Sequence, residues 1–526
     1  MPSEGPRRPR AGAPAQPLSM LKGRPPAGAP DRPPSKPSAR AAPATRPRPG
    51  TPAPAPARTC AYAVLRSVFE RSAYVEIALR AHAHALDARD RALAMRLAYG
   101  TVQRRGTLDH LIQRLAARPL KRLDAPIVAA LRLGLYELLF TGGAPDRAVV
   151  ADAVELAKAG HGHTLVNAVL RRATREGAAL LAELDDATPE GAALKHSHPE
   201  WIARLWWEEL GADEARALMA FDNEPAELAL RVNTLVARPA DVAAQLAAGV
   251  APVEGELAGV PPTGATPTGV LPVGVHGDPA IPEALVLEGP WDVHGSPQWH
   301  AGAVLAQSRG AMLPARVLAP APGERVLDLC AAPGGKTTHL AALMEGRGEV
   351  VALERNPRRA EQLRRAIARM RAVECVRVVV DDATRPLADG APFDRVLVDP
   401  PCSGLGTLQA RADLRWRVGS KDPARVAHTQ AEILAAGGAV VRPGGVLVYS
   451  TCTISTIENE QQVSAFLESH PDFVLDDLGV ELCDRAGVGV RRGRCVQTLP
   501  HRDRTAGFFI ARLRRDGGPA GGGRSR

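Results

Sequence analysis

The 526-residue sequence predicts three regions in succession: an all-α domain, a small linking region of helix and strand, and a doubly wound α/β domain. Between residues 58 and 180, apolar residues recur three and four positions apart, as in helices that pack into a bundle. A stretch rich in Gly, Pro and Val at about 231–300 favours a few short strands. After residue 301, short apolar runs alternate with amphipathic stretches, which is typical of a parallel sheet covered by helices.

Residues 1–57 differ in composition from all three regions. They contain 17 of the 47 prolines, and ten Arg or Lys against two acids, so we expect a disordered arm that cannot bury enough apolar surface to fold. Residues 512–526 add five Arg and one Asp, so most of the net charge of +9 lies in the two tails. The arm is either a solubilising leader or a tether to RNA phosphates, and composition leaves both roles open.

The sequence contains no run of 18 uncharged apolar residues and no apolar segment near its start. It therefore predicts a cytoplasmic protein without a membrane span. The seven cysteines are odd in number and lack CxxC spacing, which argues against a disulfide framework and against a metal site. Four of them have no chemical context and are expected to pack in the interior: Cys60, Cys375, Cys483 and Cys495.

The first region is predicted to be a helical bundle. Segments such as CAYAVLRSVFERSAY (60–74) and APIVAALRLGLYELLF (125–140) show the apolar spacing of helices, with Arg at intervening positions. Arg on the polar face of a helix is typical of a solvated surface, so periodicity alone does not indicate RNA binding. Residues 198–221 predict a further helical stretch before the linking region turns to strand.

The last region is predicted to contain five buried strands separated by helical stretches. A sheet with helices on both faces binds its ligands at the carboxyl ends of its strands. The residues that follow each strand are therefore candidates for the functional site. The predicted strands are 324–330, 348–354, 375–380, 393–399 and 444–450.

The first of these strands leads into DLCAAPGGKTTHL (328–340). GGKTT resembles the end of a phosphate-binding loop, but that loop requires glycine at the position of Cys330, so a nucleoside triphosphatase is disfavoured. We expect instead a glycine-rich turn at Gly334 and Gly335, which lets the backbone approach another ligand and opens the next helix.

Acidic residues follow the second, third and fourth strands. Glu354 is placed to bind ribose hydroxyls. Asp381 and Asp382 follow the third strand, and Asp399 follows the fourth. A glycine-rich turn with acids at these positions suits a cofactor with ribose, adenine and a cationic centre, which describes S-adenosylmethionine better than NAD. Any one of these acids alone is more often a loop or cap residue.

Two cysteines also follow strands. Cys402 lies in DPPCSG after the fourth strand and Cys452 lies in STCT after the fifth. In an α/β sheet both loops open at the same edge. Taken singly, each thiol is more often a small buried hydrophobic group than a reactive one. Their joint placement beside Asp399 favours nucleophilic chemistry.

Three motifs, DLCAAPGGKT, FDRVLVDPPCSG and VYSTCTISTIENE, occur in an order that resembles the Sun/NOL1/NOP2 family of RNA cytosine-C5 methyltransferases. AMRLAYGTVQRRGTLDHLI and TLVNAVLRR resemble the NusB RNA-binding fold. The two together are most similar to bacterial members that act on small-subunit ribosomal RNA. The resemblance implies a NusB-like helical RNA-binding domain over 58–180, a linking helical and β-containing subdomain over 181–300, a Rossmann-like class I methyltransferase domain over 301–513 and a disordered basic tail over 514–526.

The resemblance also implies a site. The cofactor would be S-adenosylmethionine, with Glu354 at the ribose, Asp382 at the adenine and Asp399 between cofactor and target base. Cys452 of the TC motif would be the nucleophile, and Cys402 of the PPC motif would assist product release. We predict that Lys336 supplies a positive charge that lowers the pKa of the nucleophilic thiol. The cofactor loop would comprise Cys330, Ala331, Ala332, Pro333, Gly334, Gly335 and Lys336.

Such a site would methylate C5 of a cytosine in small-subunit ribosomal RNA. A thiolate adds at C6 and makes C5 nucleophilic, which splits one difficult step into two easier ones. Asp399 would stabilise the base at its N3/N4 edge. The base must leave its stack, which favours single-stranded or partly assembled RNA.

Two alternative functions stay open. One is a non-catalytic RNA-binding assembly or antitermination factor, which would need neither Cys402 nor Cys452. The other is a methyltransferase that acts on transfer RNA or on protein. Three segments also depart from the family pattern: TCT for TCS, which keeps the hydroxyl, QSRGAM (307–312) for an acid-and-serine version, and TAGFF (505–509) for DGFF. The last two leave substrate contacts open, whereas the catalytic set is complete.

Overall fold

The computed structural model describes residues 54–158, 161–249, 273–289, 291–387 and 391–517. Most of the predicted arm (1–57) and of the predicted basic tail (514–526) lies outside these residues. The first described helix begins at Pro56 and the last strand ends at Arg515, so both elements reach two residues into the predicted tails.

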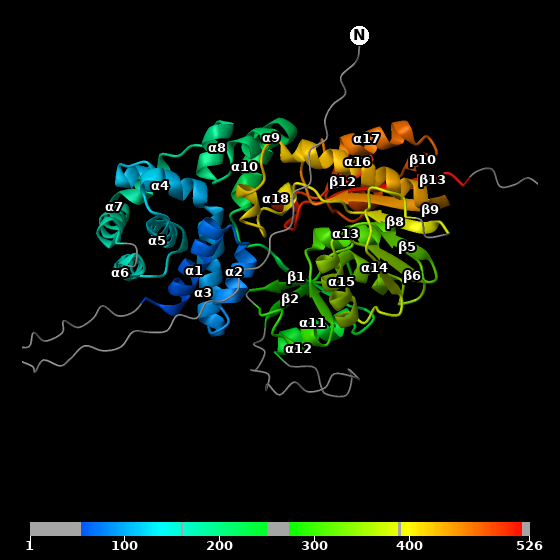
Figure 1. The fold of residues 1–526 in the computed structure, drawn as a ribbon, viewed down its shortest axis with the longest axis horizontal. Coiled ribbons are helices and arrows are strands. Elements are labelled where there is room, and N and C mark those ends of the chain that lie inside the picture. Colours follow the sequence, from blue (N-terminus) through cyan, green and yellow to red (C-terminus); the bar gives the residue numbers. More distant parts are fainter. Residues whose placement is uncertain (1–53, 159–160, 250–272, 290, 388–390, 518–526) are drawn as a thin grey trace, which may run out of the picture. The chain divides into compact units, whose positions relative to one another are not determined.

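The first region is helical, as the periodicity predicts (Figure 1). Its helices bury apolar side chains in two adjoining clusters, one around Leu65 and Leu97 and one around Leu111 and Leu131. The elements are α1 (Pro56–Arg71), α2 (Val75–His82), α3 (Ala88–Gln103), α4 (Arg105–Ala116), η1 (Leu120–Arg122), α5 (Ala125–Tyr136), η2 (Glu137–Thr141), α6 (Asp146–Leu156) and α7 (His163–Ala182).

The linking region begins with three helices and continues as a four-stranded antiparallel sheet of order β2-β3-β1-β4. The predicted helical stretch 198–221 is two helices, because Gly211 at φ +86° separates α9 from α10. The elements are α8 (Pro189–Lys195), α9 (Glu200–Leu210), α10 (Ala212–Phe221), β1 (Leu228–Val232), α11 (Pro239–Ala248), β2 (Gly274–Gly277), β3 (Ala284–Glu288), α12 (Pro297–His300) and β4 (Val304–Ala306).

The last region is built on a nine-stranded sheet of order β11-β12-β13-β9-β8-β5-β6-β7, with β10 paired to β13. The five predicted strands are β5 to β9, and they pair in parallel, as predicted. The antiparallel strands β10 to β13 were not predicted. The strands are β5 (Arg325–Asp328), β6 (Glu349–Leu353), β7 (Val376–Val379), β8 (Phe393–Val398), β9 (Val441–Thr451), β10 (Phe473–Leu475), β11 (Val490–Arg492), β12 (Cys495–Gln497) and β13 (Phe509–Arg515).

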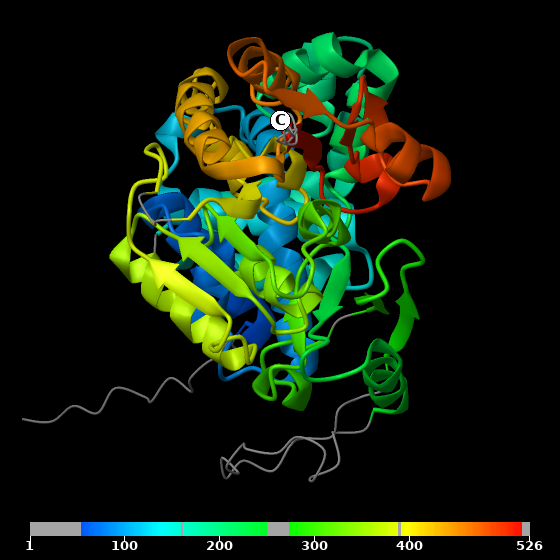
Figure 2. The ribbon, with the colours of Figure 1, turned by 90° about the vertical axis from the view of Figure 1, so that its right-hand side faces the viewer.

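Helices cover both faces of this sheet (Figures 1 and 2). Alternate strand residues such as Leu327 and Val396 pack against α16 and α17, whereas Val326 and Leu397 pack against α13 and α14. The remaining elements are α13 (Arg309–Leu318), α14 (Gly335–Leu343), α15 (Pro357–Arg369), η4 (Leu405–Thr407), η5 (Leu414–Trp416), α16 (Asp422–Val440), α17 (Glu460–Ser469), η6 (Gly479–Arg485) and α18 (Pro500–Asp503).

The segment 403–417 between β8 and α16 joins all three regions, and we call it the β8–α16 loop. Its Arg415 is fully buried and donates hydrogen bonds to the carbonyl oxygens of Gln103, 3.1 Å away, and Ser197, 3.0 Å away. Arg415 also donates to the carbonyl oxygen of Asp222 at 3.0 Å. Trp416 adds a 2.7 Å hydrogen bond from its indole nitrogen to the carbonyl oxygen of Val102. The loop is therefore held by the helical domain and by the linking region.

We expect Arg415→Met to lower the stability of the protein. The substitution deprives buried carbonyl oxygens of their donor, and each unsatisfied buried polar group costs about 1–3 kcal/mol. Thermal unfolding followed by scanning calorimetry should show a melting temperature lower by about 5 °C or more. Arg425→Met is the matched control, because Arg425 lies on the exposed side of α16 and its ion pair with Asp422 is solvated. Equal shifts for the two variants would contradict the assignment.

Candidate active site

The candidate site lies where the order of the parallel strands reverses. The chain enters the sheet at β5, continues to β6 and β7 on one side, and then places β8 and β9 on the other. In such a sheet, the carboxyl ends of β5 and β8 diverge and leave a crevice for a ligand. Lys336, Asp399, Cys402 and Cys452 all follow strands at this edge, and their side chains interact in two pairs.

The two thiols form one of these pairs. Cys402 Sγ and Cys452 Sγ lie 3.2 Å apart, which is a hydrogen-bonding distance and well beyond a disulfide bond. The hydrogen bond with Cys402 lowers the pKa of Cys452, although burial opposes this effect. The same contact and burial raise the pKa of Cys402 well above its usual value. Of the two, Cys452 is therefore the thiol that more readily becomes a thiolate.

Lys336 and Asp399 form the second pair. Lys336 Nζ donates to Asp399 Oδ2 at 2.7 Å, and Ser450 Oγ donates to Asp399 Oδ1 at 2.9 Å. Burial acts to lower the pKa of Lys336, but attraction to Asp399 outweighs it and the pKa lies above its usual value. Lys336 also favours the Cys452 thiolate, yet the hydrogen bond from Cys402 is the larger cause. Asp399 is therefore the stronger partner of Lys336, and Cys452 is a weaker one.

The loop from Cys330 to Lys336 turns from β5 into α14. Gly334 adopts φ +108° at the start of the helix, and a Cβ there would lie 2.9 Å from Leu363 Cδ1, so only glycine fits without strain. The backbone N–H of Ala331 donates to the carbonyl oxygen of Leu353 at 3.0 Å, which fixes the turn against β6. Pro333 lies between Ala332 and Gly334 in this turn. Burial raises the pKa of the Cys330 thiol, so Cys330 is a packing residue of the loop rather than a reactive one.

Two buried acceptors beside this loop lack a partner. Asp328 Oδ1 and Gln307 Oε1 have no hydrogen-bond donor among the described residues. Gln307 Oε1 faces Gly335, at 3.7 Å from where a Cβ of that residue would lie. Burial raises the pKa of Asp328 to about 6, against a hydrogen bond from Thr337. These two unpaired oxygen atoms, one from a carboxylate and one from an amide, lie beside a glycine turn. They could accept hydrogen bonds from the ammonium and hydroxyl groups of a nucleoside that carries an amino acid.

Glu354 and Asp382 follow neighbouring strands, as predicted. Glu354 is buried, and its Oε1 accepts a 2.7 Å hydrogen bond from the backbone N–H of Asn356. Asp382 follows β7 and accepts hydrogen bonds from the N–H and the hydroxyl of Thr384 at 3.1 and 2.9 Å. Both acids stabilise their own turns. Glu354 is a buried acid beside the loop, whereas Asp382 is a turn cap.

Two further residues, Glu458 and Asn459, were not singled out from the sequence and hold the segments that carry the thiols. The Glu458 carboxylate accepts hydrogen bonds from the N–H of Ser403, at 2.8 Å, and from its hydroxyl. Ser403 Oγ lies 2.6 Å from Thr453 Oγ1, so the residues that follow the two cysteines are joined. Asn459 accepts from the hydroxyl of Thr451 and donates to the carbonyl oxygen of Thr453 at 3.1 Å. Their signal was the ENE at the end of VYSTCTISTIENE, next to the TC motif.

A close backbone contact brings the β8–α16 loop to Cys452. Gly406 donates its N–H to the carbonyl oxygen of Cys452 at 3.0 Å and accepts a 2.7 Å hydrogen bond from the N–H of Gly507. A Cβ on Gly406 would lie 2.1 Å from the carbonyl oxygen of Gly507. Only glycine therefore permits this approach.

The two segments that depart most from the family pattern contact each other. Gly310 of QSRGAM donates its backbone N–H to the hydroxyl of Thr505 of TAGFF at 3.0 Å. Arg309 forms ion pairs with Glu227 at 2.9 Å and with Asp278 at 2.8 Å, and Thr505 is hydrogen-bonded to Glu227. These side chains join the linking region to the methyltransferase-like sheet.

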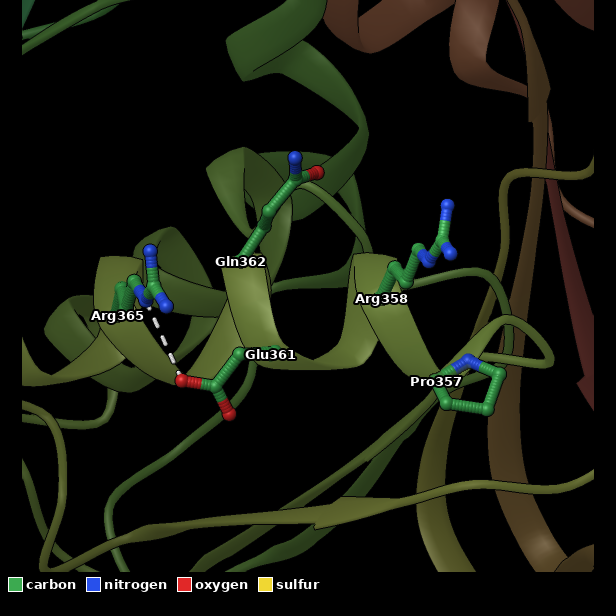
Figure 3. A pocket seen from close by; sticks show the side chains of 5 residues that line it. All are labelled: Pro357, Arg358, Glu361, Gln362 and Arg365. Atoms are coloured by element: carbon green, nitrogen blue, oxygen red, sulfur yellow. Dashed lines mark hydrogen bonds and ion pairs between the residues drawn. The ribbon is translucent and has the colours of Figure 1, made fainter. Parts of the chain in front are cut away.

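A shallow hollow of about 410 Å³ on the outer side of α15 is separate from this site (Figure 3). All the residues that line it come from one helix, and Glu361 and Arg365 form an ion pair across it at 3.3 Å. It contains none of the predicted site residues. Among the described residues, no group of three His, Cys, Asp or Glu side chains could hold a metal ion, and no described helix is long and apolar enough to cross a membrane.

Comparisons with known proteins agree with this geometry. A family model described as 16S rRNA methyltransferase RsmB/F matches residues 315–514, one for the NusB family matches 55–175, and a ferredoxin-like domain of RsmF/B-like methyltransferases matches 198–259. The chain is similar to a probable ribosomal RNA small subunit methyltransferase B of Bacillus subtilis, with 33% identity over 88% of this chain and 99% of the relative.

Two further proteins extend the comparison. The chain is 34% identical to the ribosomal RNA small subunit methyltransferase B of Sodalis glossinidius over 81% of this chain and 90% of that protein. A crystal structure described as PH0851 has a TM-score of 0.69 and 25% identity, covering 88% of this chain and 100% of its own. With both thiols at the strand ends and relatives aligned over nearly their full length, the chain belongs to the RsmB/F family of ribosomal RNA small subunit methyltransferases.

Proposed function

We propose that this protein methylates C5 of a cytosine in small-subunit ribosomal RNA, using S-adenosylmethionine and a transient covalent bond to Cys452. The observation that carries the proposal is the pair of thiols 3.2 Å apart at the ligand edge of the sheet, with the pKa of one lowered by the other. A non-catalytic RNA-binding factor would need neither thiol, nor the hydrogen-bond network that holds them.

The residues around the glycine turn fit the cofactor. Asp328 and Gln307 offer unpaired buried acceptors, and Glu354 offers a buried carboxylate after the next strand. When bound, S-adenosylmethionine supplies an electrophilic methyl group. The loop 330–336 and Glu354 would hold it, with Asp382 at the outer end and Asp399 facing the target base.

Cys452 would begin the reaction. Its thiolate forms a bond to C6 of the flipped cytosine, which moves electron density to C5 and N3. The Lys336–Asp399 pair, 2.7 Å apart, would provide polar groups at the N3/N4 edge where this charge develops. C5 would then accept the methyl group, as the bond between that methyl group and the sulfonium sulfur breaks and leaves a neutral thioether. Loss of the C5 proton to a base and breakage of the C6–S bond release the methylated cytosine and return the thiolate.

Cys402 would lie beside the bond that must break, because its Sγ is 3.2 Å from Cys452 Sγ. Its pKa is high, so it remains a protonated thiol that hydrogen-bonds to the Cys452 sulfur. Such a donor stabilises the departing thiolate and would favour release of the product. The cytosine must be extruded into this edge, which costs least in single-stranded or partly assembled RNA.

Cys452→Ala should abolish methylation, because no other thiol at the strand ends has a lowered pKa. The measurement is transfer of labelled methyl groups to unmethylated small-subunit RNA, followed by bisulfite mapping of 5-methylcytosine. Transfer RNA is the comparison substrate and would receive the label if the alternative substrate class is correct. Cys375→Ala, a buried cysteine elsewhere, serves as control. Activity that survives Cys452→Ala would exclude the covalent role.

Cys402→Ala should trap the covalent protein–RNA adduct. Without the Cys402 hydrogen bond, the Cys452 thiolate is a poorer leaving group, so the adduct should persist on a denaturing gel. The pKa of Cys452 should also rise, because the main cause of its depression is removed. The pH profile of Cys452 alkylation should therefore move to higher pH. An unchanged profile together with no adduct would exclude both roles of Cys402.

Glu458→Gln should slow methylation by about tenfold or more while RNA affinity stays unchanged. The amide would present a donor to the Ser403 N–H and to Gln430 Nε2, both of which donate to this carboxylate, so the two cysteine loops would separate. Single-turnover rates measure the effect. Glu460→Gln is the matched control, since Glu460 lies two residues on and its ion pair within the described residues, with Arg492 at 3.7 Å, is a long one. Equal rates for the two variants would remove Glu458 from the positioning of the thiols.

A further inference from the structure

A hollow of about 600 Å³ lies between the helical domain and the η5 turn of the β8–α16 loop. We call it the junction pocket. Phe69 of α1 and Trp416 of η5 are among its lining residues, and the guanidinium of Arg105 lies 5.6 Å from the centre of the first ring and 5.3 Å from the second. The pocket thus combines aromatic surfaces from two regions of the chain with a cation that contacts both.

The junction pocket has more positive than negative charge. Arg132 uses both carboxylate oxygens of Asp109, at 2.6 and 2.8 Å, and Arg105 reaches the same carboxylate only at 3.8 Å. Within the described part of the chain, Arg105 donates no hydrogen bond and Lys121 forms no ion pair. Burial, and then the nearby charge of Arg132, lower the pKa of Arg105, and the distant Asp109 carboxylate opposes this only in part.

The carboxylate at the pocket wall does not neutralise these cations. Asp413 pairs with Arg417 at 2.9 Å, and both belong to the β8–α16 loop. Two cations, Arg105 and Lys121, therefore keep free donors at a pocket that Phe69 and Trp416 also line. An anion with a flat, stackable group satisfies both features.

We propose that the junction pocket binds a nucleotide of the substrate RNA other than the cytosine that is methylated; this inference rests on the proposed function. Single-stranded RNA is bound by aromatic side chains that stack on its bases and by cations that contact its phosphates. The volume suits a ligand of nucleotide size. The wall formed by Trp416 lies on the loop that starts next to Cys402, so the pocket and the candidate site share one segment of the chain.

Lys121→Gln in the full-length protein tests the proposal. The probe is a fluorescein-labelled 12-nucleotide oligouridylate, and its Kd is measured by anisotropy over a series of KCl concentrations. We expect affinity to fall by about five- to tenfold, and the slope of log K against log salt to fall by about 0.7, the value for one phosphate contact in a single strand. Arg105→Gln should weaken binding at least as much, because it removes both a cation and a stacking surface.

Arg122→Gln is the matched control. Arg122 is the exposed neighbour of Lys121 on η1, carries the same charge and does not line the pocket. Its affinity and salt slope should stay at those of the unmodified protein. Equal losses for Lys121→Gln and Arg122→Gln would overturn the proposal, because diffuse attraction would then explain the binding. Displacement of the probe by polyglutamate as readily as by unlabelled oligouridylate would also overturn it, in favour of an acidic protein ligand.

The Cys452→Ala variant separates this inference from the proposed function. It should bind the probe like the unmodified protein, because Cys452 does not line the pocket. If the unmodified protein forms no 5-methylcytosine but Lys121→Gln still weakens probe binding, the proposed chemistry is rejected and the RNA site stands. If the unmodified protein methylates RNA normally but Lys121→Gln binds the probe with unchanged affinity, the RNA site is rejected and the proposed chemistry stands.

Discussion

The arrangement of the candidate site depends on one contact, between Cys402 Sγ and Cys452 Sγ, which lie 3.2 Å apart. Cys402 and Cys452 come from different loops, so the distance between them depends on how β8 and β9 end and on what ties the loops together. Parallel pairing aligns the two strands up to Val398 and Tyr449. Beyond that point the loops are held together by the hydrogen bonds of Glu458 and by the close backbone approach that Gly406 permits. A shift of about 1 Å in either loop would remove the hydrogen bond that distinguishes the two thiols.

Charge is balanced around this contact in two steps. Asp399 acts to raise the pKa of Cys452, so an unpaired carboxylate there would suppress the thiolate. Lys336 pairs with Asp399 at 2.7 Å, which offsets the effect of this carboxylate on the thiol. Lys336 acts on the thiol in two ways: it pairs with the acid, and its charge directly favours the Cys452 thiolate, although less than the hydrogen bond with Cys402 does. The catalytic role that we predicted for Lys336 stays a prediction.

The sequence was most informative where local pattern determines structure. The apolar runs of β5 to β9 predicted a parallel sheet, and the residues after each run lie at its ligand edge. The antiparallel strands β10 to β13 could not be predicted from the sequence, because most of them are short and their pairing depends on partners far along the chain. Arg415 shows the same limit. Its neighbours at Gln103 and Ser197 are hundreds of residues away, and no spacing in the sequence marks them. The ENE sequence could have pointed to Glu458, but not to its partner Ser403, which precedes it by 55 residues.

The burial of Arg415 has a consequence for how this protein can be divided. The acceptors of its guanidinium include carbonyl oxygens of the helical domain and of the linking region, so excision of the α/β domain would leave a charged side chain without them. The loop that begins next to Cys402 would then lack its outer support. The α/β domain is therefore not structurally self-contained, because the support of its β8–α16 loop comes from residues that precede it in the chain.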